Sequence, residues 1–202
     1  MHIVCSDLEG VFIPEIWINV ALKTGIDELK LTTRDISDYD ILMKRRLEIL
    51  RKNRLAIQDI RKVISGLEPL PGALEFMNLI RSRLQLIVVS DTFMEFAGPL
   101  MEKLGRPTLF CHNLTIDDKG NITDYVLRQK NAKENVVKAL QNLNFKVIAI
   151  GDSYNDIPML IKADHGFLFN PPRNVVNEYS DLQVITTYDK LEFFISEIVR
   201  HE

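Results

Sequence analysis

Three short apolar segments, far apart in the sequence, each end at an aspartate. They are HIVCSD at 2–7, LQLIVVSD at 84–91 and KVIAIGD at 146–152. Runs of this length indicate buried strands, and helical patterns separate them along the chain. Strands that alternate with helices predict an α/β fold with a parallel, doubly wound, Rossmann-like sheet. Because ligands bind beyond the carboxyl ends of the strands in such sheets, the three aspartates are expected to lie close together. These are Asp7, Asp91 and Asp152.

The segment after the first strand has helical periodicity instead of strand periodicity. Its expected helices cover residues 16–23, 39–54 and 57–67. Two prolines and a glycine in EPLPG, at 68–72, then mark a boundary. We therefore predict a core domain of residues 1–13 and 71–202, with a helical domain inserted at 14–70.

The second part of the chain carries more local expectations. The helix over 93–105 is expected to be interrupted, or to start afresh, near Gly98 and Pro99. A glycine turn flanked by β-branched residues makes 117–127 similar to a β-hairpin. The SDT stretch at 90–92 is expected at a strand-to-helix turn, where hydroxyl and backbone N–H groups can bind an anion.

Lys133 is a candidate for binding an anionic ligand. It is expected in the first turn of a helix, behind Asn131 as a plausible N-cap. The helix dipole disfavours a cation at the N-terminal end of a helix. A lysine at this position is therefore a candidate for binding an anionic ligand. Lys130 could reach the same site, and the sequence leaves that alternative open.

The acidic residues favour a hard divalent cation. Converging carboxylates repel one another and raise at least one pKa unless a cation lies among them. Mg²⁺ prefers oxygen ligands and commonly combines one or two carboxylates with phosphate oxygens of the substrate. The four histidines show no ligand spacing, and Cys5 and Cys111 are too far apart for a zinc motif. Mg²⁺ is therefore the expected cofactor.

Composition and charge limit the partners. The 202 residues carry a formal net charge of -3 and are 46% hydrophobic, with no basic stripe for nucleic acid or anionic lipid. We find no secretory leader pattern and no apolar run near the ~20 residues of a membrane span. We expect a cytoplasmic protein that acts on a small molecule and binds neither nucleic acid nor membrane, with a homodimer as one option.

Four motifs, in order, resemble the haloacid dehalogenase superfamily of phosphotransferases. They are DLEGV at 7–11, SDT at 90–92, Lys133 and GDSYND at 151–156. The helical insertion resembles the cap of phosphoserine phosphatases, which implies a helical cap inserted after the first strand. Further stretches are similar to the ThrH-type phosphoserine phosphatases and homoserine phosphotransferases. These are PEIW at 14–17, DYD at 38–40, MKRRLEIL at 43–50 and SDTF at 90–93.

The resemblance implies a reaction. Asp7 would be the nucleophile that forms an aspartyl phosphate, and Glu9 would be the general acid and then the general base. If the strand geometry persists there, residues i and i+2 point to the same face, so both could reach one phosphoryl group. The implied substrate is O-phospho-L-serine, with transfer to homoserine as a further activity, in serine and threonine biosynthesis.

The resemblance also implies ligands. Mg²⁺ would be bound by the side chains of Asp7 and Asp152 and by the backbone carbonyl of Glu9, with Asp156 supporting the metal site. Glu15 would meet the ammonium group of the substrate, and Arg46 its carboxylate, in bidentate geometry. Asn155 would contact the phosphoryl group or Asp152. The remaining implied phosphoryl-binding residues are Ser90, Asp91 and Lys133.

Some assignments have structural alternatives. Arg45 and Lys44 adjoin Arg46 in a basic run that is typical of a solvated face. Glu15 could be an ordinary acid at a helix start. Asp7, taken alone, could be a helix N-cap, as could Ser90 or Thr92.

The function also has alternatives. Glu9 and Val11 depart from the DxDGT pattern of the wider superfamily, which leaves open whether water or an alcohol accepts the phosphoryl group. A phosphatase of another small metabolite is one alternative. A signalling receiver domain, which also uses a phospho-accepting Asp, is another, although it would lack the helical insertion.

Overall fold

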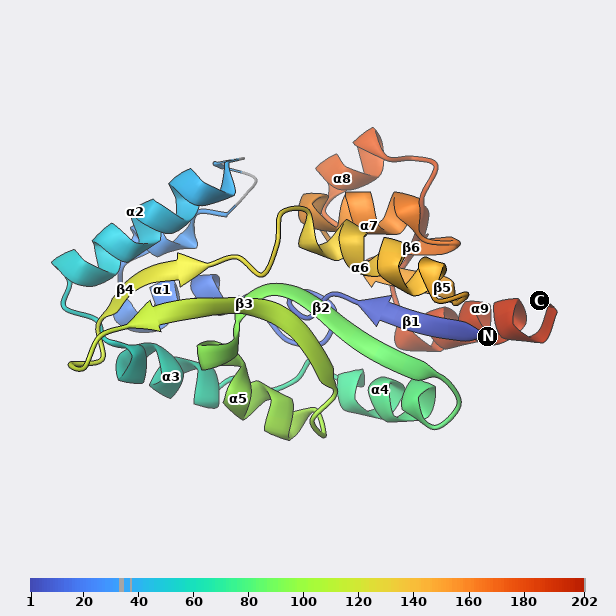
Figure 1. The fold of residues 1–202 in the computed structure, drawn as a ribbon, viewed down its shortest axis with the longest axis horizontal. Helices are drawn as coiled ribbons and strands as arrows, with labels where there is room; N and C mark the ends of the chain where they lie inside the picture. The colour runs from blue at the N-terminus through green and yellow to red at the C-terminus, as the bar shows by residue number, and fades with distance from the viewer. Residues whose placement is uncertain (33–34, 37, 202) are drawn as a thin grey trace.

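The computed structural model describes residues 1–32, 35–36 and 38–201, and within them seven strands form a single sheet (Figure 1). The order across the sheet is β4-β3-β2-β1-β5-β6-β7, and all neighbours are parallel except β4, which runs antiparallel to β3. The predicted α/β class and doubly wound, mostly parallel sheet are confirmed. The strands are β1 (His2–Ser6), β2 (Gln85–Phe93), β3 (Thr108–Ile116), β4 (Ile122–Val126), β5 (Lys146–Gly151), β6 (His165–Phe169) and β7 (Gln183–Ile185).

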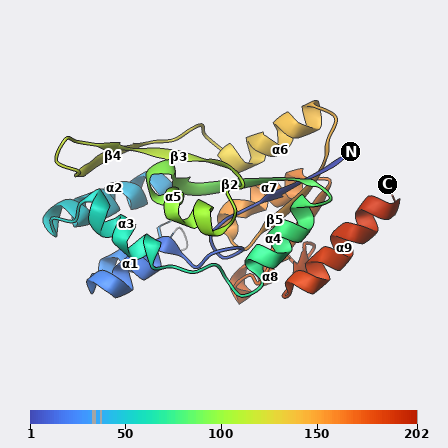
Figure 2. The same cartoon turned by 90° about the horizontal axis from the view of Figure 1, so that it is seen from below.

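Helices cover both faces of the sheet (Figures 1 and 2). The helices of the core are α4 (Ala73–Arg81), α5 (Met94–Lys103), α6 (Ala132–Asn142), α7 (Ile157–Lys162), α8 (Arg173–Glu178) and α9 (Tyr188–His201). Side chains alternate along β1, so that Ile3 and Cys5 pack toward α6, α7 and α8, while Val4 packs toward α4, α5 and α9. Both faces of β1 are therefore buried, which explains its continuous apolar run. Among the described residues, no helix is long and apolar enough to cross a membrane.

A helical cap follows β1 and lies over one end of the sheet (Figure 1). It contains α1 (Ile16–Thr24), a 3-10 turn (Asp27–Lys30), α2 (Tyr39–Lys52) and α3 (Ile57–Ser65). The Trp17 ring contacts Phe96 of α5 edge-on, with 5.7 Å between centroids, so cap and core share one apolar cluster. The two chain segments that join cap and core are linked where the Leu70 N–H donates to the Phe12 carbonyl at 2.9 Å.

Helix α5 differs from the sequence prediction. It runs without a break through Pro99, so the predicted interruption is wrong. Proline has no N–H to donate to the carbonyl four residues earlier, which is that of Glu95. The Arg61 side chain of α3 donates to that carbonyl at 2.7 Å instead. A long-range contact therefore replaces the missing helical hydrogen bond.

Further local expectations need correction, and one helix is new. Strand β2 continues to Phe93, so Ser90, Asp91 and Thr92 lie in its irregular last part and not at a strand-to-helix turn. Asn131 occupies the N-cap position of α6 in the left-handed region, with φ of 51°, and its side chain makes no capping hydrogen bond. Helix α8 was not anticipated. The hairpin predicted over 117–127 exists as the antiparallel pair β3 and β4, but its first strand is Thr108–Ile116, so the predicted range holds only the turn and β4.

Candidate active site

The chain turns sharply after β1 and brings two acids to one cavity. The Asp7 N–H donates to the Ile150 carbonyl of β5 at 2.9 Å, which extends the ladder by one residue. The extended geometry then stops, because the Phe12 N–H donates back to the Leu8 carbonyl at 2.8 Å. The strand geometry that would place residues 7 and 9 on one face does not continue past Asp7. The explanation based on that geometry is therefore wrong. Both acids nevertheless line the same cavity of about 90 Å³.

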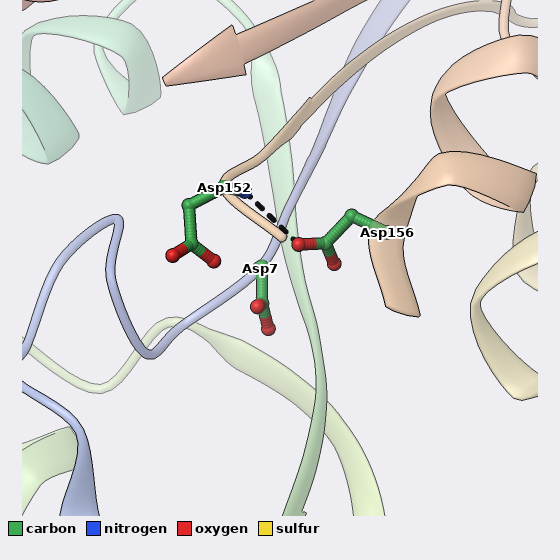
Figure 3. Close-up of side chains that lie close together, drawn as sticks. All are labelled: Asp7, Asp152 and Asp156. Atoms are coloured by element: carbon green, nitrogen blue, oxygen red, sulfur yellow. Dashed lines mark hydrogen bonds between the residues drawn. The ribbon is translucent and has the colours of Figure 1, made fainter. Parts of the chain in front are cut away.

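Three carboxylates lie close together, and Asp7 is far in the sequence from the other two, Asp152 and Asp156 (Figure 3). Asp7 follows β1, Asp152 follows β5 and Asp156 ends the 3-10 turn Tyr154–Asp156. Each offers an oxygen within 4.8 Å of the others, and all three residues are buried. The parallel pairing of β1 with β5 is what aligns the first two. Asp91, on β2, lies beside this group, since Lys133 contacts it as well.

Glycine at position 10 is required by this arrangement. Gly10 has a φ of +76°, and a Cβ there would lie 2.3 Å from the Asp152 Oδ2. Only glycine accepts both the left-handed backbone and the close approach of that carboxylate. The DLEG stretch is therefore a tight turn shaped around Asp152.

Lys133 lies at the centre of the acids and is buried. Its Nζ is 2.7 Å from Asp156, 3.0 Å from Asp7 and 3.6 Å from Asp91. Although burial lowers the pKa of the Lys133 ammonium, these carboxylates outweigh it and raise the pKa well above its usual value. Lys130 is exposed and lines only the neighbouring outer groove. Of the two lysines, the structure brings Lys133 to the acids.

Asp156 organises its neighbours through both carboxylate oxygens. Oδ1 accepts from Lys133, and Oδ2 accepts the backbone N–H groups of Asp152 and Ser153 at 3.0 and 3.1 Å. The adjacent Gly151 makes room for it, since a Cβ there would lie 2.3 Å from the Asp156 Cβ. Asp156 therefore fixes the loop that carries Asp152.

Arg46 reaches the cavity from the cap. The guanidinium lies over Trp17, 4.6 Å from the ring centroid, and Nη2 donates to the Leu31 carbonyl at 2.9 Å. Its Nε is buried and has no hydrogen-bond partner in the part of the chain that the structure describes. Burial lowers the pKa of Arg46 to about 10, so it remains charged at neutral pH. The adjoining Lys44 and Arg45 are exposed.

Burial and crowding change the pKa of the acids. The pKa of Asp7 is raised well above its usual value by burial and by Asp156, against the opposing effect of Lys133. Burial and the neighbouring Glu15 raise the pKa of Glu9 to about 8. Burial and Asp156 raise that of Asp152 to about 7. The site holds more negative charge than its own cations neutralise, which favours binding of a further cation.

The donor set fits Mg²⁺. The clustered ligands are carboxylate oxygens, with no imidazole or thiolate among them, and hard oxygen donors are what Mg²⁺ prefers. Both oxygens of Asp156 already accept hydrogen bonds, so Asp7 and Asp152 are the carboxylates better placed to bind an ion.

The other expected site residues also line the small cavity. Ser90 is buried there, and its Oγ accepts the Thr92 N–H at 3.2 Å. Glu15 is half-buried on the cap side. The Asn155 amide donates to Asp91 Oδ2 at 2.8 Å. A larger outer groove of about 770 Å³ adjoins the cavity. The two share Tyr39, Asp91, Lys133 and Asn155.

Two residues near the site were not singled out from the sequence. Tyr39 begins α2, and its hydroxyl donates to the Asp91 carbonyl at 3.1 Å. His112, on β3, lies 3.4 Å from Asp91 through its Nε2. Tyr39 lies in the DYD stretch that carried the resemblance and His112 gives no spacing signal, so the role of each next to Asp91 is visible only in the folded chain.

Fold and acidic site together define a class of hydrolases. The family model of the haloacid dehalogenase-like hydrolases matches residues 9–164. The chain belongs to this family, as the four motifs predicted, and the receiver-domain alternative is set aside.

Two curated relatives extend over nearly the whole chain. The phosphoserine phosphatase ThrH of Pseudomonas aeruginosa is 53% identical over 192 residues, which cover 95% of this chain and 94% of that protein. A phosphoserine phosphatase of Pseudomonas syringae pv. tomato is 51% identical, over 95% of this chain and 81% of that protein. The predicted resemblance to ThrH-type proteins is confirmed.

Solved structures share the fold at low sequence identity. A phosphoserine phosphatase in its apo form superposes with a TM-score of 0.76 and 23% identity, covering 99% of this chain and 98% of the other. A substrate-bound phosphoserine phosphatase complex also gives a TM-score of 0.76, with 22% identity over 96% and 97% of the two chains. These matches establish the architecture.

Proposed function

We propose that this protein is a Mg²⁺-dependent phosphoserine phosphatase that hydrolyses O-phospho-L-serine to L-serine through an aspartyl-phosphate intermediate. The observation that carries the proposal is one small cavity lined by two chemically different groups of residues. Asp7, Lys133 and Ser90 come from the core, while Arg46 and Glu15 come from the cap. The two relatives named as phosphoserine phosphatases support the same substrate.

The cap residues suit the amino-acid part of the substrate. Arg46 is charged and buried, and its Nε has no hydrogen-bond partner among the described residues, which costs free energy unless a ligand supplies an acceptor. A carboxylate can accept from two guanidinium N–H groups at once. Glu15 supplies the opposite charge for an ammonium group. A small zwitterion therefore satisfies both residues together.

The first step of the proposed reaction is attack by Asp7. A carboxylate oxygen of Asp7 forms a bond to phosphorus, and the bond between phosphorus and the serine oxygen breaks. Glu9, with a pKa of about 8, is protonated at neutral pH and donates its proton to the leaving alkoxide. Lys133 lies within 3.0 Å of Asp7 and balances charge on the nucleophile and the phosphoryl group.

The second step releases phosphate. Glu9, now ionised, accepts a proton from water, whose oxygen bonds to phosphorus while the bond from phosphorus to Asp7 breaks. Ser90 and Asn155 are proposed to bind phosphoryl oxygens in both steps. Both steps use the same residues, and Asp7 is regenerated.

Asp7 and Asp152, with the backbone carbonyl of Glu9, are proposed to hold the metal. A bound Mg²⁺ supplies positive charge for the phosphoryl oxygens. Asp156 stabilises this arrangement, because it accepts hydrogen bonds from the N–H groups of the Asp152 loop and from Lys133.

Transfer to homoserine is a second activity of the same proposed site. Homoserine carries the same ammonium and carboxylate groups as serine, so Arg46 and Glu15 would hold either molecule. An alcohol oxygen would then replace water in the second step. A cytoplasmic location and a homodimer remain predictions, for cell fractionation and sedimentation to test.

Purified protein with phosphoserine tests the proposal directly. We expect Mg²⁺-dependent release of phosphate that EDTA abolishes, and phosphohomoserine when homoserine is added. The matched comparison is a panel of sugar phosphates and phosphohomoserine at equal concentration. If a sugar phosphate has the higher kcat/KM, the chain is a phosphatase of another metabolite. Absence of any Mg²⁺-dependent turnover contradicts the reaction itself.

A further inference from the structure

Asp91 is an unusual neighbour for a phosphoryl-binding site, because it adds another anion. Its side chain is 30% exposed and lies where the small cavity meets the outer groove. Burial by itself raises its pKa, but Lys133, His112 and Asn155 outweigh this and hold the pKa of Asp91 well below its usual range. Asp91 therefore stays ionised and would repel a phosphoryl group that approached it.

Both carboxylate oxygens of Asp91 are already in use. Oδ2 accepts from the Asn155 amide at 2.8 Å and lies 3.6 Å from the Lys133 ammonium. Oδ1 lies 3.4 Å from the His112 Nε2. The carboxylate thus connects two residues proposed to act on the phosphoryl group with one that lies away from it.

The hydrogen bonds around His112 determine which ring nitrogen carries the proton. The Arg128 backbone N–H donates to the His112 Nδ1 at 3.1 Å, so Nδ1 is an acceptor. In a neutral imidazole the proton is then on Nε2, on the side of Asp91. The ring is 3% exposed and contacts the rings of Tyr39 and Phe93, each at 6.3 Å between centroids. It therefore has little freedom to turn away.

The backbone of Asp91 is held as well. The Tyr39 hydroxyl, from the cap, donates to the Asp91 carbonyl, and His112, from β3, lies beside the Asp91 carboxylate. The cap and β3 therefore both contact Asp91. With His112 beside Oδ1, the carboxylate is held so that Oδ2 accepts from Asn155 and lies 3.6 Å from Lys133. Without that partner, Oδ1 would be free to rotate toward Lys133 or into the outer groove.

We propose that His112 and Asp91 form a positioning pair that holds Lys133 and Asn155 in place for phosphoryl transfer. This deepens the proposed function and rests on it. It replaces the phosphoryl-binding role that the family resemblance implied for Asp91. In this proposal neither side chain binds the phosphoryl group. The pair acts on kcat through the two residues that it orients.

Two substitutions at His112 separate the two hydrogen-bonding sides of the ring. Gln can place an amide donor near the Nε2 position, facing Asp91. Asn can place an acceptor near the Nδ1 position for the Arg128 N–H, but has no group that reaches Asp91. We expect His112→Asn to lower kcat by about 10- to 100-fold with KM for phosphoserine nearly unchanged, because Arg46 and Glu15 are untouched. His112→Gln should recover most of kcat.

The controls keep the inference separate from the choice of substrate. The exposed His201 provides a matched variant, and His201→Asn should have wild-type kinetics. The same variants are assayed with p-nitrophenyl phosphate, so the loss in kcat is measured even if phosphoserine is not the substrate. Equal kcat in His112→Asn and wild type overturns the pair. Failure of wild type with phosphoserine alone overturns only the proposed substrate.

A spectroscopic measurement tests the pair without turnover. In protein labelled with ¹⁵N-histidine, the neutral His112 ring should show a protonated Nε2 and an unprotonated Nδ1. Asp91→Asn should shift the Nε2 signal while leaving that of His201 unchanged. A proton on Nδ1 in the wild type contradicts the geometry, including in the case where His112→Asn does not fold.

Discussion

Replacing Lys133 by Met tests whether the acidic cluster depends on its own ammonium group. Met keeps most of the side-chain length but removes the charge that lies 2.7 Å from Asp156 and 3.0 Å from Asp7. Removing one partner of a buried ion pair costs about 3–5 kcal/mol, because the other charge stays buried without compensation. We expect the free energy of unfolding to fall by about that amount at pH 7.5 in EDTA.

The loss in free energy of unfolding caused by Lys133→Met should also depend on pH. Lys133 opposes the rise in the pKa of Asp7, so its removal raises that pKa further. An acid whose pKa is higher folded than unfolded binds more protons when folded, and stability is lost as the pH rises above the unfolded value of 3.8. The stability deficit of the variant should therefore be smaller at pH 5.5 than at pH 7.5.

Urea unfolding, followed by the fluorescence of the single tryptophan, Trp17, measures both effects. The matched control is Lys130→Met on the exposed surface, which should change stability by less than about 0.5 kcal/mol. A deficit below about 1 kcal/mol for Lys133→Met, constant between the two pH values, would refute the reasoning.

Three further substitutions test separate parts of the site. Asp7→Asn should lower turnover by at least about 1,000-fold while urea unfolding shows an intact fold, and retained activity would mean that another group is the nucleophile. Arg46→Ala should raise KM by about 10- to 100-fold for phosphoserine, but little for p-nitrophenyl phosphate, which has no carboxylate; equal increases would remove Arg46 from carboxylate recognition. Gly10→Ala should lower the free energy of unfolding by about 1–3 kcal/mol and reduce Mg²⁺-dependent turnover, since its Cβ would collide with Asp152, and a wild-type melting temperature and rate would contradict that account.

The sequence predicts what depends on local pattern. The apolar runs around Val4, Val88 and Ile148 identify the central strands, because residues buried on both faces must be apolar. The strand ends then identify Asp7 and Asp152 as neighbours. These features follow from hydrophobic burial and from the general rule that parallel strands of such a sheet end at the same edge.

The rest depends on contacts between residues far apart in the chain. The helix continues through Pro99 because Arg61 reaches the Glu95 carbonyl, and no local rule includes that contact. The partners of Asp91 are a similar case, because His112 reaches it from another strand. The choice of Lys133 over Lys130 came from position at a helix start, but its three carboxylate contacts require the folded sheet.

The position of β1 in the middle of the sheet has a consequence for how the chain is made. Within this chain, β1 is synthesised before its neighbours β2 and β5, which are separated from it by the whole cap and by more than half the chain. Both edges of the nascent strand therefore stay unpaired until β2 and β5 are synthesised, which allows aggregation and chaperone binding. Asp7 and Asp152 can meet only after β5 has emerged, so no shorter nascent chain contains a complete site.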